Sequence, residues 1–255
     1  MRSTTKRTRS PRGSGELLAE EIIASATALL LEEGDDAAVS IRAVAGRVGV
    51  TPPSIYLHFA DKDALLDAVC ARYFEQLDGV LGEVSDGIDD PLERALQQGL
   101  AYVRFAVETP VLYRLAFRQA PPGGGGASMV DEVLAASAFA RISATVTELA
   151  GEGFFPVSDV TEVVLEFWSA AHGVASLMLA KPGLPWGDDL ALAESLMRSV
   201  CLGRASLGVL GAASEPCDVR AWLGRQRLDN GDNEAVARHE SQEKVKSELD
   251  SSRTR

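Results

Sequence analysis

Residues 40–62 read SIRAVAGRVGVTPPSIYLHFADK, and they carry the start and stop signals of two short helices in succession. Ser40 is a typical N-cap for the first helix, and Gly49, which adopts the left-handed conformation easily, is a typical end. Thr51 is placed to cap the second helix, and Pro52 takes its first position, where the missing N–H breaks no hydrogen bond. We therefore expect two capped helices joined by a tight turn.

The apolar residues of this stretch recur at the spacing of one buried helix face. They are Val44, Val48, Ile55 and Phe59. They predict two helices that pack on a common core, as in a helix-turn-helix, where the first turn of the second helix faces DNA. Tyr56 and His58 point away from the buried face and can donate to phosphate oxygens. The spacing alone is equally compatible with two ordinary core helices.

The rest of the chain is also predicted to be helical, without a strand pattern or an internal repeat. Apolar spacing predicts a helix over 16–33, and Asp61 caps a long helix that fades near residues 79–82. Further helices are expected at 92–107, 111–118, 128–149, 159–179 and 188–210, with a PPGGGG loop at 121–126. The predicted fold class is therefore all-α.

Composition predicts four segments. Residues 1–15 form a basic arm, residues 16–62 form a three-helix domain that contains the candidate helix-turn-helix, and residues 63–228 form a larger helical domain. Residues 229–255 contain almost no large apolar side chain, so we expect a disordered tail.

Charge is distributed unevenly along the 255 residues. The net charge is −12, yet residues 1–12 carry five basic side chains and no acid. Residues 1–62 hold eight basic and eight acidic residues, so the surplus of negative charge lies after them. This asymmetry indicates that the first quarter of the chain meets a polyanion and the remainder repels it.

Several classes of protein are disfavoured. No run approaches the ~18 uninterrupted apolar residues of a membrane helix, and the basic N-terminus lacks the apolar stretch of a secretory signal. That N-terminus resembles a transit peptide only loosely. Cys70, Cys201 and Cys217 are odd in number and far apart, so we expect reduced thiols. We expect a cytoplasmic protein that is nucleoid-associated when bound to DNA.

No catalytic, metal or cofactor site is predicted. The glycines at 151–153 lack a phosphate-binding pattern, residues 203–206 miss the spacing of a nucleophile elbow, and the three histidines are scattered. Two alternatives to DNA binding stay open: a helical small-molecule enzyme or sequestering protein, and a protein–protein adaptor whose helix pair never meets DNA.

Residues 16–66 strongly resemble the DNA-binding region of TetR-family transcriptional regulators. The shared positions are Tyr56, His58, Phe59 and the Asp-Lys-Asp run at 61–63. A shorter likeness lies further along, where Trp168, His172 and Gly173 resemble the Trp-His-Gly type of TetR C-terminal domain. Together the two likenesses cover most of residues 16–210.

This resemblance implies two sets of DNA-contacting residues. The phosphate-binding set is Thr51, Tyr56, His58 and Lys62, and the base-reading set is Arg42, Pro52, Pro53 and Ser54. Arg42 is the one long donor of the second set, which suits a bidentate contact to guanine. Pro52 and Pro53 replace the Lys or Gly of many relatives. Because neither proline can donate a hydrogen bond, we expect few direct hydrogen bonds to the DNA bases. The basic arm can compensate by entering the minor groove, or it is simply a solvated start.

The resemblance also implies a ligand-binding and dimerisation domain. The helices at 159–179 and 188–210 are apolar around much of their circumference, which suits a four-helix interface between two copies. A two-fold dimer presents its recognition helices about one DNA turn apart, ~34–36 Å, to a palindromic operator.

A hydrophobic small-molecule effector is expected between the helices of this domain. The candidate lining residues are Tyr102, Phe105, Tyr113, Phe117, Phe139, Trp168 and His172, each of which can alternatively serve as core packing. The expected function is that of a repressor, the family default, which the effector releases from its operator. The helix after Asp61 is expected to be the only rigid link between the domains.

Overall fold

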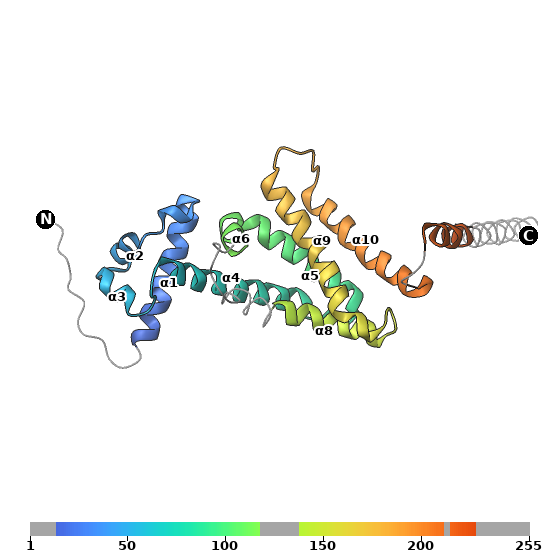
Figure 1. Ribbon diagram of the computed structural model, residues 1–255, viewed down its shortest axis with the longest axis horizontal. Coiled ribbons are helices and arrows are strands. Elements are labelled where there is room, and N and C mark those ends of the chain that lie inside the picture. Colours follow the sequence, from blue (N-terminus) through green and yellow to red (C-terminus); the bar gives the residue numbers. More distant parts are fainter. Residues whose placement is uncertain (1–13, 118–137, 212–214, 228–255) are drawn as a thin grey trace, which may run out of the picture. The chain divides into compact units, whose positions relative to one another are not determined.

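The computed structural model describes residues 14–117, 138–211 and 215–227, and these form helices with no strand among them (Figure 1). The elements are α1 (Ser14–Glu33), η1 (Asp36–Ala38), α2 (Ile41–Val48), α3 (Pro52–Tyr56), α4 (Lys62–Ser85), α5 (Pro91–Glu108), α6 (Pro110–Ala116), α8 (Ala138–Gly151), η2 (Val157–Asp159), α9 (Val160–Ala180) and α10 (Asp189–Leu210). Residues 216–227 are also helical. The chain divides into two compact units, Met1–Leu202 and Gly203–Arg255. The predicted all-α fold class is confirmed.

The first three helices pack around one small apolar core. Its fully buried side chains are Ile22, Ala26 and Leu30 of α1, Val44 of α2 and Ile55 of α3. α2 contacts both α1 and α3, and Figure 1 shows these helices side by side. Burying each large aliphatic side chain contributes about 1.5–3 kcal/mol relative to exposure. The predicted common face is present, with Val48 and Phe59 partly buried at its edge.

Capping side chains fix where α2 and α4 begin. The Ser40 hydroxyl accepts a hydrogen bond from the N–H of Ala43 at 3.1 Å, and the Asp61 carboxylate accepts one from the N–H of Ala64 at 2.8 Å. α2 ends at Gly49, whose φ of 79° lies in the left-handed region that glycine tolerates. These three predictions from the sequence are confirmed.

The start of α3 differs from the prediction. Thr51 has the backbone conformation of an N-cap, but its side chain makes no capping hydrogen bond. The reason is local, because Pro53 has no N–H and the N–H of Ser54 bonds to the Thr51 carbonyl at 2.9 Å. The Thr51 hydroxyl instead lies 2.9 Å from the Ser54 hydroxyl. Both hydroxyls therefore belong to one pair at the first turn of α3.

α4 extends past the glycines where it was expected to fade and ends at Ser85. Gly82 lies beneath the Arg141 guanidinium, which would be 3.4 Å from a Cβ at that position. Arg141 in turn donates to Asp78 at 2.7 Å. The guanidinium thus lies at van der Waals distance from this position, and the ion pair with Asp78 fixes the contact between α8 and α4.

α5 contacts α4, α8 and α9 and forms the centre of the larger helical body. Gly99 of α5 marks the tightest approach, since a Cβ there would lie 2.7 Å from Met197 Cε and 3.0 Å from Phe167 Cζ. Gln98 beside it is a buried polar residue, and its amide donates to the Ser85 and Thr145 hydroxyls at 2.9 and 3.1 Å. This polar contact joins α4, α5 and α8.

One helical stretch, Val157–Ala180, is long and apolar enough by length and composition to be a candidate membrane span among the described residues. Its sequence includes Glu162, Glu166 and His172, so no uninterrupted apolar run is present. Core helices of globular proteins pass the same test, and this one contacts α5 and α8 through a buried face that includes Val164 and Phe167.

Candidate functional site

The residues predicted to contact DNA lie together on α2, on α3 and directly after α3. Arg42 is exposed on the first turn of α2 and makes no hydrogen bond or ion pair within the described part of the chain. Thr51 and Pro53 are exposed, whereas Pro52 and Ser54 are half-buried. Tyr56, at the end of α3, is 53% exposed. The helix pair therefore offers a long donor, two hydroxyls, a phenol and an apolar proline edge, and we call these residues the α2–α3 surface.

His58 and Leu57 differ from each other in exposure. The His58 ring is half-buried, 6.5 Å from the Phe59 ring between centroids and close to Gly15 of α1. Leu57 is 84% exposed, the highest value among the exposed large apolar side chains of the described residues. The sequence analysis did not predict Leu57 as a DNA contact, although it lies between two residues that were predicted, Tyr56 and His58. An exposed aliphatic side chain here suits contact with a thymine methyl group.

Lys62 is less free to bind a DNA phosphate than the sequence predicted. Its ammonium donates to the backbone carbonyl of Asp36 at 2.7 Å, and the side chain is half-buried. The bond ties the start of α4 to η1, an element that the sequence analysis did not predict. Two of the three ammonium hydrogens remain for a phosphate, so Lys62 stays a predicted DNA contact, with a structural role beside it.

The cations of this surface are few. Arg47 forms a two-armed ion pair with Glu32, with both nitrogen–oxygen distances at 2.6 Å. This pairing holds the pKa of Glu32 below its ordinary value. Between residues 14 and 62 the only basic residues are Arg42, Arg47 and Lys62, against eight acidic residues. Arg42 is therefore the one basic residue of this region without a protein partner among the described residues.

A second cluster gathers most of the predicted effector residues around His172 of α9. Its Nδ1 lies 3.0 Å from the Tyr102 hydroxyl of α5 and 2.8 Å from the Tyr113 hydroxyl of α6. The Tyr113 hydroxyl also lies 2.8 Å from the Ser176 hydroxyl and 3.3 Å from the carbonyl oxygen of His172. Ser176, four residues after His172, was missed by the sequence reasoning, although its helical spacing was a usable signal. Three helices thus meet in one polar network.

Aromatic rings surround this network. Phe117 makes an edge-to-face contact with His172 at 4.5 Å, and Trp168 lies 5.6 Å from His172, both between ring centroids. Phe105 does not contact His172 among the described pairs but packs on Tyr73 of α4 at 4.9 Å. Phe139 of α8 is partly buried against the core, without a ring contact to the cluster among the described residues. Five of the seven predicted residues are therefore brought together.

Burial dominates the protonation behaviour of the cluster. It raises the pKa of the Tyr102 and Tyr113 phenols and lowers the pKa of His172. No charged side chain contributes to the shift of His172. At neutral pH the cluster is accordingly an uncharged hydrogen-bonding site.

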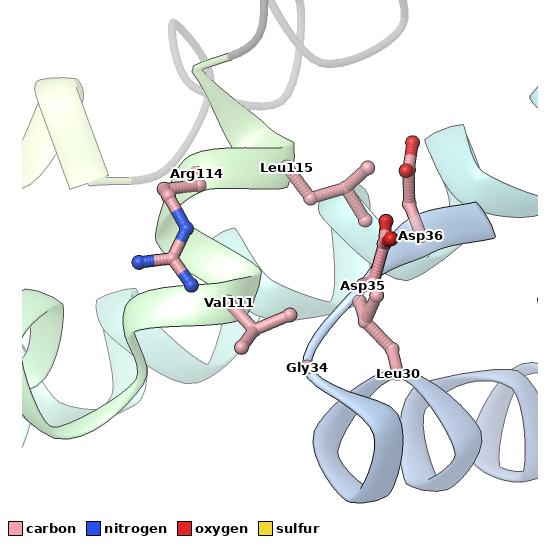
Figure 2. Close-up of a pocket in the computed structure, with 7 residues that line it drawn as sticks. All are labelled: Leu30, Gly34, Asp35, Asp36, Val111, Arg114 and Leu115. Atoms are coloured by element: carbon pink, nitrogen blue, oxygen red, sulfur yellow. The ribbon is translucent and has the colours of Figure 1, made fainter. Parts of the chain in front are cut away.

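A cleft of about 240 Å³ separates α6 from the end of α1 and η1 (Figure 2). Leu30, Val111 and Leu115 form its apolar part, Arg114 lies on the α6 side, and Asp35 and Asp36 lie on the opposite side. α6 also contacts α1 directly. The expectation that α4 is the only rigid link to the DNA-binding helices is therefore wrong, because α6 provides a second link.

Comparison with known proteins identifies the family. Residues 22–69 match the model described as bacterial regulatory proteins, tetR family, and residues 95–200 match the tetracyclin repressor-like C-terminal domain. The chain is also 31% identical over 164 residues to the HTH-type transcriptional regulator Rv0681 of Mycobacterium tuberculosis, covering 64% of this chain and 70% of the relative. The chain belongs to the TetR family of transcriptional regulators.

Solved structures show the same fold as this TetR-family regulator. A protein of unknown function from Rhodococcus sp. RHA1 has a TM-score of 0.63 and 27% identity, covering 73% of this chain and 94% of that one. The structure of RolR in complex with resorcinol has a TM-score of 0.58 and 20% identity, covering 78% and 96% of the two chains.

The family match places the two clusters in different domains of the regulator. The α2–α3 surface lies within the helix-turn-helix region of a TetR-family regulator, and the His172 cluster lies within its ligand-binding C-terminal domain. The alternatives of an adaptor and a small-molecule enzyme have no support from these matches.

Proposed function

We propose that this TetR-family regulator is a repressor that leaves a palindromic operator when it binds a small hydrophobic effector. The observation that carries the proposal is the α2–α3 surface, where Arg42 stands exposed on the first turn of α2, a helix that contacts α3. The base-reading set is Arg42, Pro52, Pro53 and Ser54, and the phosphate-binding set is Thr51, Tyr56, His58 and Lys62. Leu57 joins the apolar part of this surface.

The regulator acts as a homodimer in this proposal. α9 and the first part of α10 carry exposed large apolar side chains that a monomer would leave in water, among them Leu165, Leu177, Leu190 and Leu192. Two copies joined through these helices bury those side chains at a two-fold axis. The axis then presents two recognition surfaces about one DNA turn apart, which is why we expect a palindromic operator.

Effector binding at the His172 cluster changes DNA affinity through α4 and α6. Tyr113 of α6 is bonded to the cluster, while Val111 and Arg114 of the same short helix face α1 and η1 across the cleft. Because these residues lie on one short helix, a displacement of α6 at the cluster would also move the side chains that face the DNA-binding helices. To shift the operator-bound fraction from 99:1 to 1:99, the effector must prefer the released state by ~5.5 kcal/mol.

The proposal keeps the domain division predicted from the sequence. Residues 16–62 bind DNA and residues 63–228 bind the effector and the second copy. Residues 1–13 of the basic arm and the whole tail at 229–255 lie outside the described residues. We assign the arm to the DNA backbone or minor groove. We assign no catalytic role and no cofactor, and we place the regulator in the cytoplasm, on the nucleoid when DNA is bound.

A salt-titrated binding assay tests the proposal. Purified regulator is titrated against the DNA upstream of its own gene and against a shuffled fragment of equal length, from about 50 to 200 mM salt. We expect tight binding to the upstream DNA only, with an affinity that falls steeply as salt rises. Equal binding to both fragments, or no binding at low salt, would contradict the proposed function.

A further inference from the structure

Two N–H groups at the His172 cluster, on Trp168 and on His172, can be left without an acceptor among the described residues. Tyr102 has a single hydrogen-bond partner of good geometry among the described residues, the Nδ1 atom of His172 at 3.0 Å. We assign the phenol hydrogen to this bond, because the bond has good geometry and supplies the buried hydroxyl with an acceptor, although the Tyr113 hydroxyl also lies nearby. Nδ1 of His172 therefore carries a lone pair, and the imidazole proton lies on Nε2.

Tyr113 is satisfied without competing for that lone pair. Its hydroxyl can donate to the Ser176 hydroxyl at 2.8 Å or to the His172 carbonyl at 3.3 Å. If Tyr113 donates to the His172 carbonyl and Ser176 donates to Tyr113, every hydroxyl of the network has an acceptor. The assignment leaves the Nε2–H of His172 as a donor to which no described residue offers an acceptor.

Trp168 supplies a second such donor. Its indole nitrogen is buried and has no hydrogen-bond partner of good geometry in the described part of the chain, although it lies near the Tyr102 oxygen. Trp168 and His172 are four residues apart on α9, so both rings lie on one helix face, with centroids 5.6 Å apart. Leaving a buried donor unpaired destabilises the unliganded protein, and a bound acceptor would remove that penalty.

The surroundings restrict what that acceptor can be. No lysine or arginine makes a hydrogen bond or an ion pair with the cluster among the described residues, and burying a carboxylate without a cation is costly. Phe117 flanks both donors, with its ring centroid 4.5 Å from that of His172 and 6.4 Å from that of Trp168. Flat rings on two sides favour a planar body.

We propose that the effector is an uncharged planar molecule with a carbonyl oxygen that accepts from the indole N–H of Trp168 and the Nε2–H of His172. The inference rests on the proposed function, since it names the ligand class of the same site. A carbonyl oxygen has two lone pairs, so one atom can satisfy both donors. An aromatic ketone, ester or lactone fits this description, and a free fatty acid does not.

Three naphthalene probes separate these chemistries by calorimetric titration of the full-length regulator without DNA. 2-Acetonaphthone is uncharged and has the carbonyl, 2-naphthoate replaces it with a carboxylate, and 2-ethylnaphthalene has no acceptor. We expect the ketone to bind about tenfold more tightly than either of the others, the equivalent of one or two hydrogen bonds. Equal affinities, tighter binding of the carboxylate or no binding of the ketone would overturn the proposal.

Matched variants locate the contacts. Trp168→Phe removes the N–H and keeps a ring, so the ketone should lose about five- to tenfold in affinity while the hydrocarbon is unchanged. His172→Asn keeps an acceptor near Nδ1 and loses the Nε2–H, whereas His172→Gln keeps a donor near Nε2 and should retain more ketone affinity. An unchanged ketone affinity in a folded Trp168→Phe protein would refute the assignment. If a variant does not fold, the three probes on the wild-type protein still decide.

The outcome is separable from that of the proposed function. Ketone binding that leaves DNA affinity unchanged would support the ligand class and contradict effector-driven release. If the regulator binds the upstream fragment but not the ketone, its function as a DNA-binding regulator is supported and the proposed ligand class is contradicted.

Discussion

Arg42 and Tyr56 lie on the same exposed surface but are expected to do different work. Arg42→Ala removes the one unpaired long donor, so affinity for the operator should fall about 5- to 100-fold, with a much smaller loss on random DNA. Tyr56→Phe removes only a hydroxyl and should weaken binding to both DNAs to a similar, smaller extent. Competition binding with operator and random duplexes measures both. An equal loss on the two DNAs for Arg42→Ala would contradict its base-reading role.

The burial of His172 predicts how the stability of the folded protein depends on pH. Burial lowers its pKa in the folded state from the ordinary value of 6.5, so the unfolded chain binds the proton more readily. The stability that this group contributes is present above about pH 6.5 and is lost as pH falls below that value. Thermal unfolding at pH 7.5 and pH 5.5 should show a larger fall in melting temperature for the wild type than for His172→Asn. Identical shifts in the two proteins would show that His172 is not buried as described.

Gly99 on α5 and Gly79 on α4 provide a matched pair among the helices. Gly99→Ala places a methyl group 3.0 Å from the rigid Phe167 ring and should lower the free energy of unfolding, by about 1–3 kcal/mol. Gly79 has open space around it, so Gly79→Ala should raise that free energy by about 0.5–1 kcal/mol. Urea unfolding of both variants checks the pair. A stabilising Gly99→Ala would mean that α5 does not approach α9 and α10 so closely.

The arm before α1 is predicted to supply most of the charge that α2 and α3 lack. Residues 1–12 contain five basic side chains, while Arg47 is paired with Glu32 and Lys62 is tied to Asp36. Deleting residues 1–12 should reduce the slope of log affinity against log salt by up to about 4, since each phosphate that the arm neutralises adds ~0.9 to that slope. Replacing the five cations with glutamine at full length is the control for chain length. An unchanged slope in both proteins would show that the arm stays in solvent.

Much of this architecture could be predicted from local signals. The caps Ser40, Gly49 and Asp61 act within four residues along the chain, so sequence alone located α2 and the start of α4. The prediction failed at Thr51 because Pro53 has no N–H and the N–H of Ser54 bonds to the Thr51 carbonyl, so neither group is left for the Thr51 side chain. The ion pair from Arg141 to Asp78 of α4 joins residues 63 positions apart, and no local rule contains that contact.

The candidate sites were predictable to different degrees. The DNA-contacting residues follow one another in sequence, so a single motif located them, although the bond from Lys62 to Asp36 depends on an η1 helix that was not predicted. Trp168 and His172 share a helix face and were both found. Their partners Tyr102 and Tyr113 were found only as aromatic candidates, since their hydroxyls meet His172 through three-dimensional packing across 59 to 70 residues.

The regulator acts on DNA as two copies in this account, and one variant tests that requirement. Leu165→Glu places a charge on the exposed apolar side of α9 and should shift sedimentation towards the monomer, with a matching loss of operator affinity. Leu31→Glu changes an equally exposed leucine of α1 and should leave the dimer intact. Dissociation by both variants, or by neither, would contradict an interface on α9.

The central claim is that the α2–α3 surface docks into duplex DNA twice per homodimer. Hydroxyl-radical footprinting of the regulator on its upstream DNA tests it most directly. We predict two symmetric protected half-sites about one helical turn apart, ~34–36 Å or a little more, both of which disappear in Arg42→Ala at the same protein concentration. A single protected site, or two that persist unchanged in Arg42→Ala, would contradict the claim.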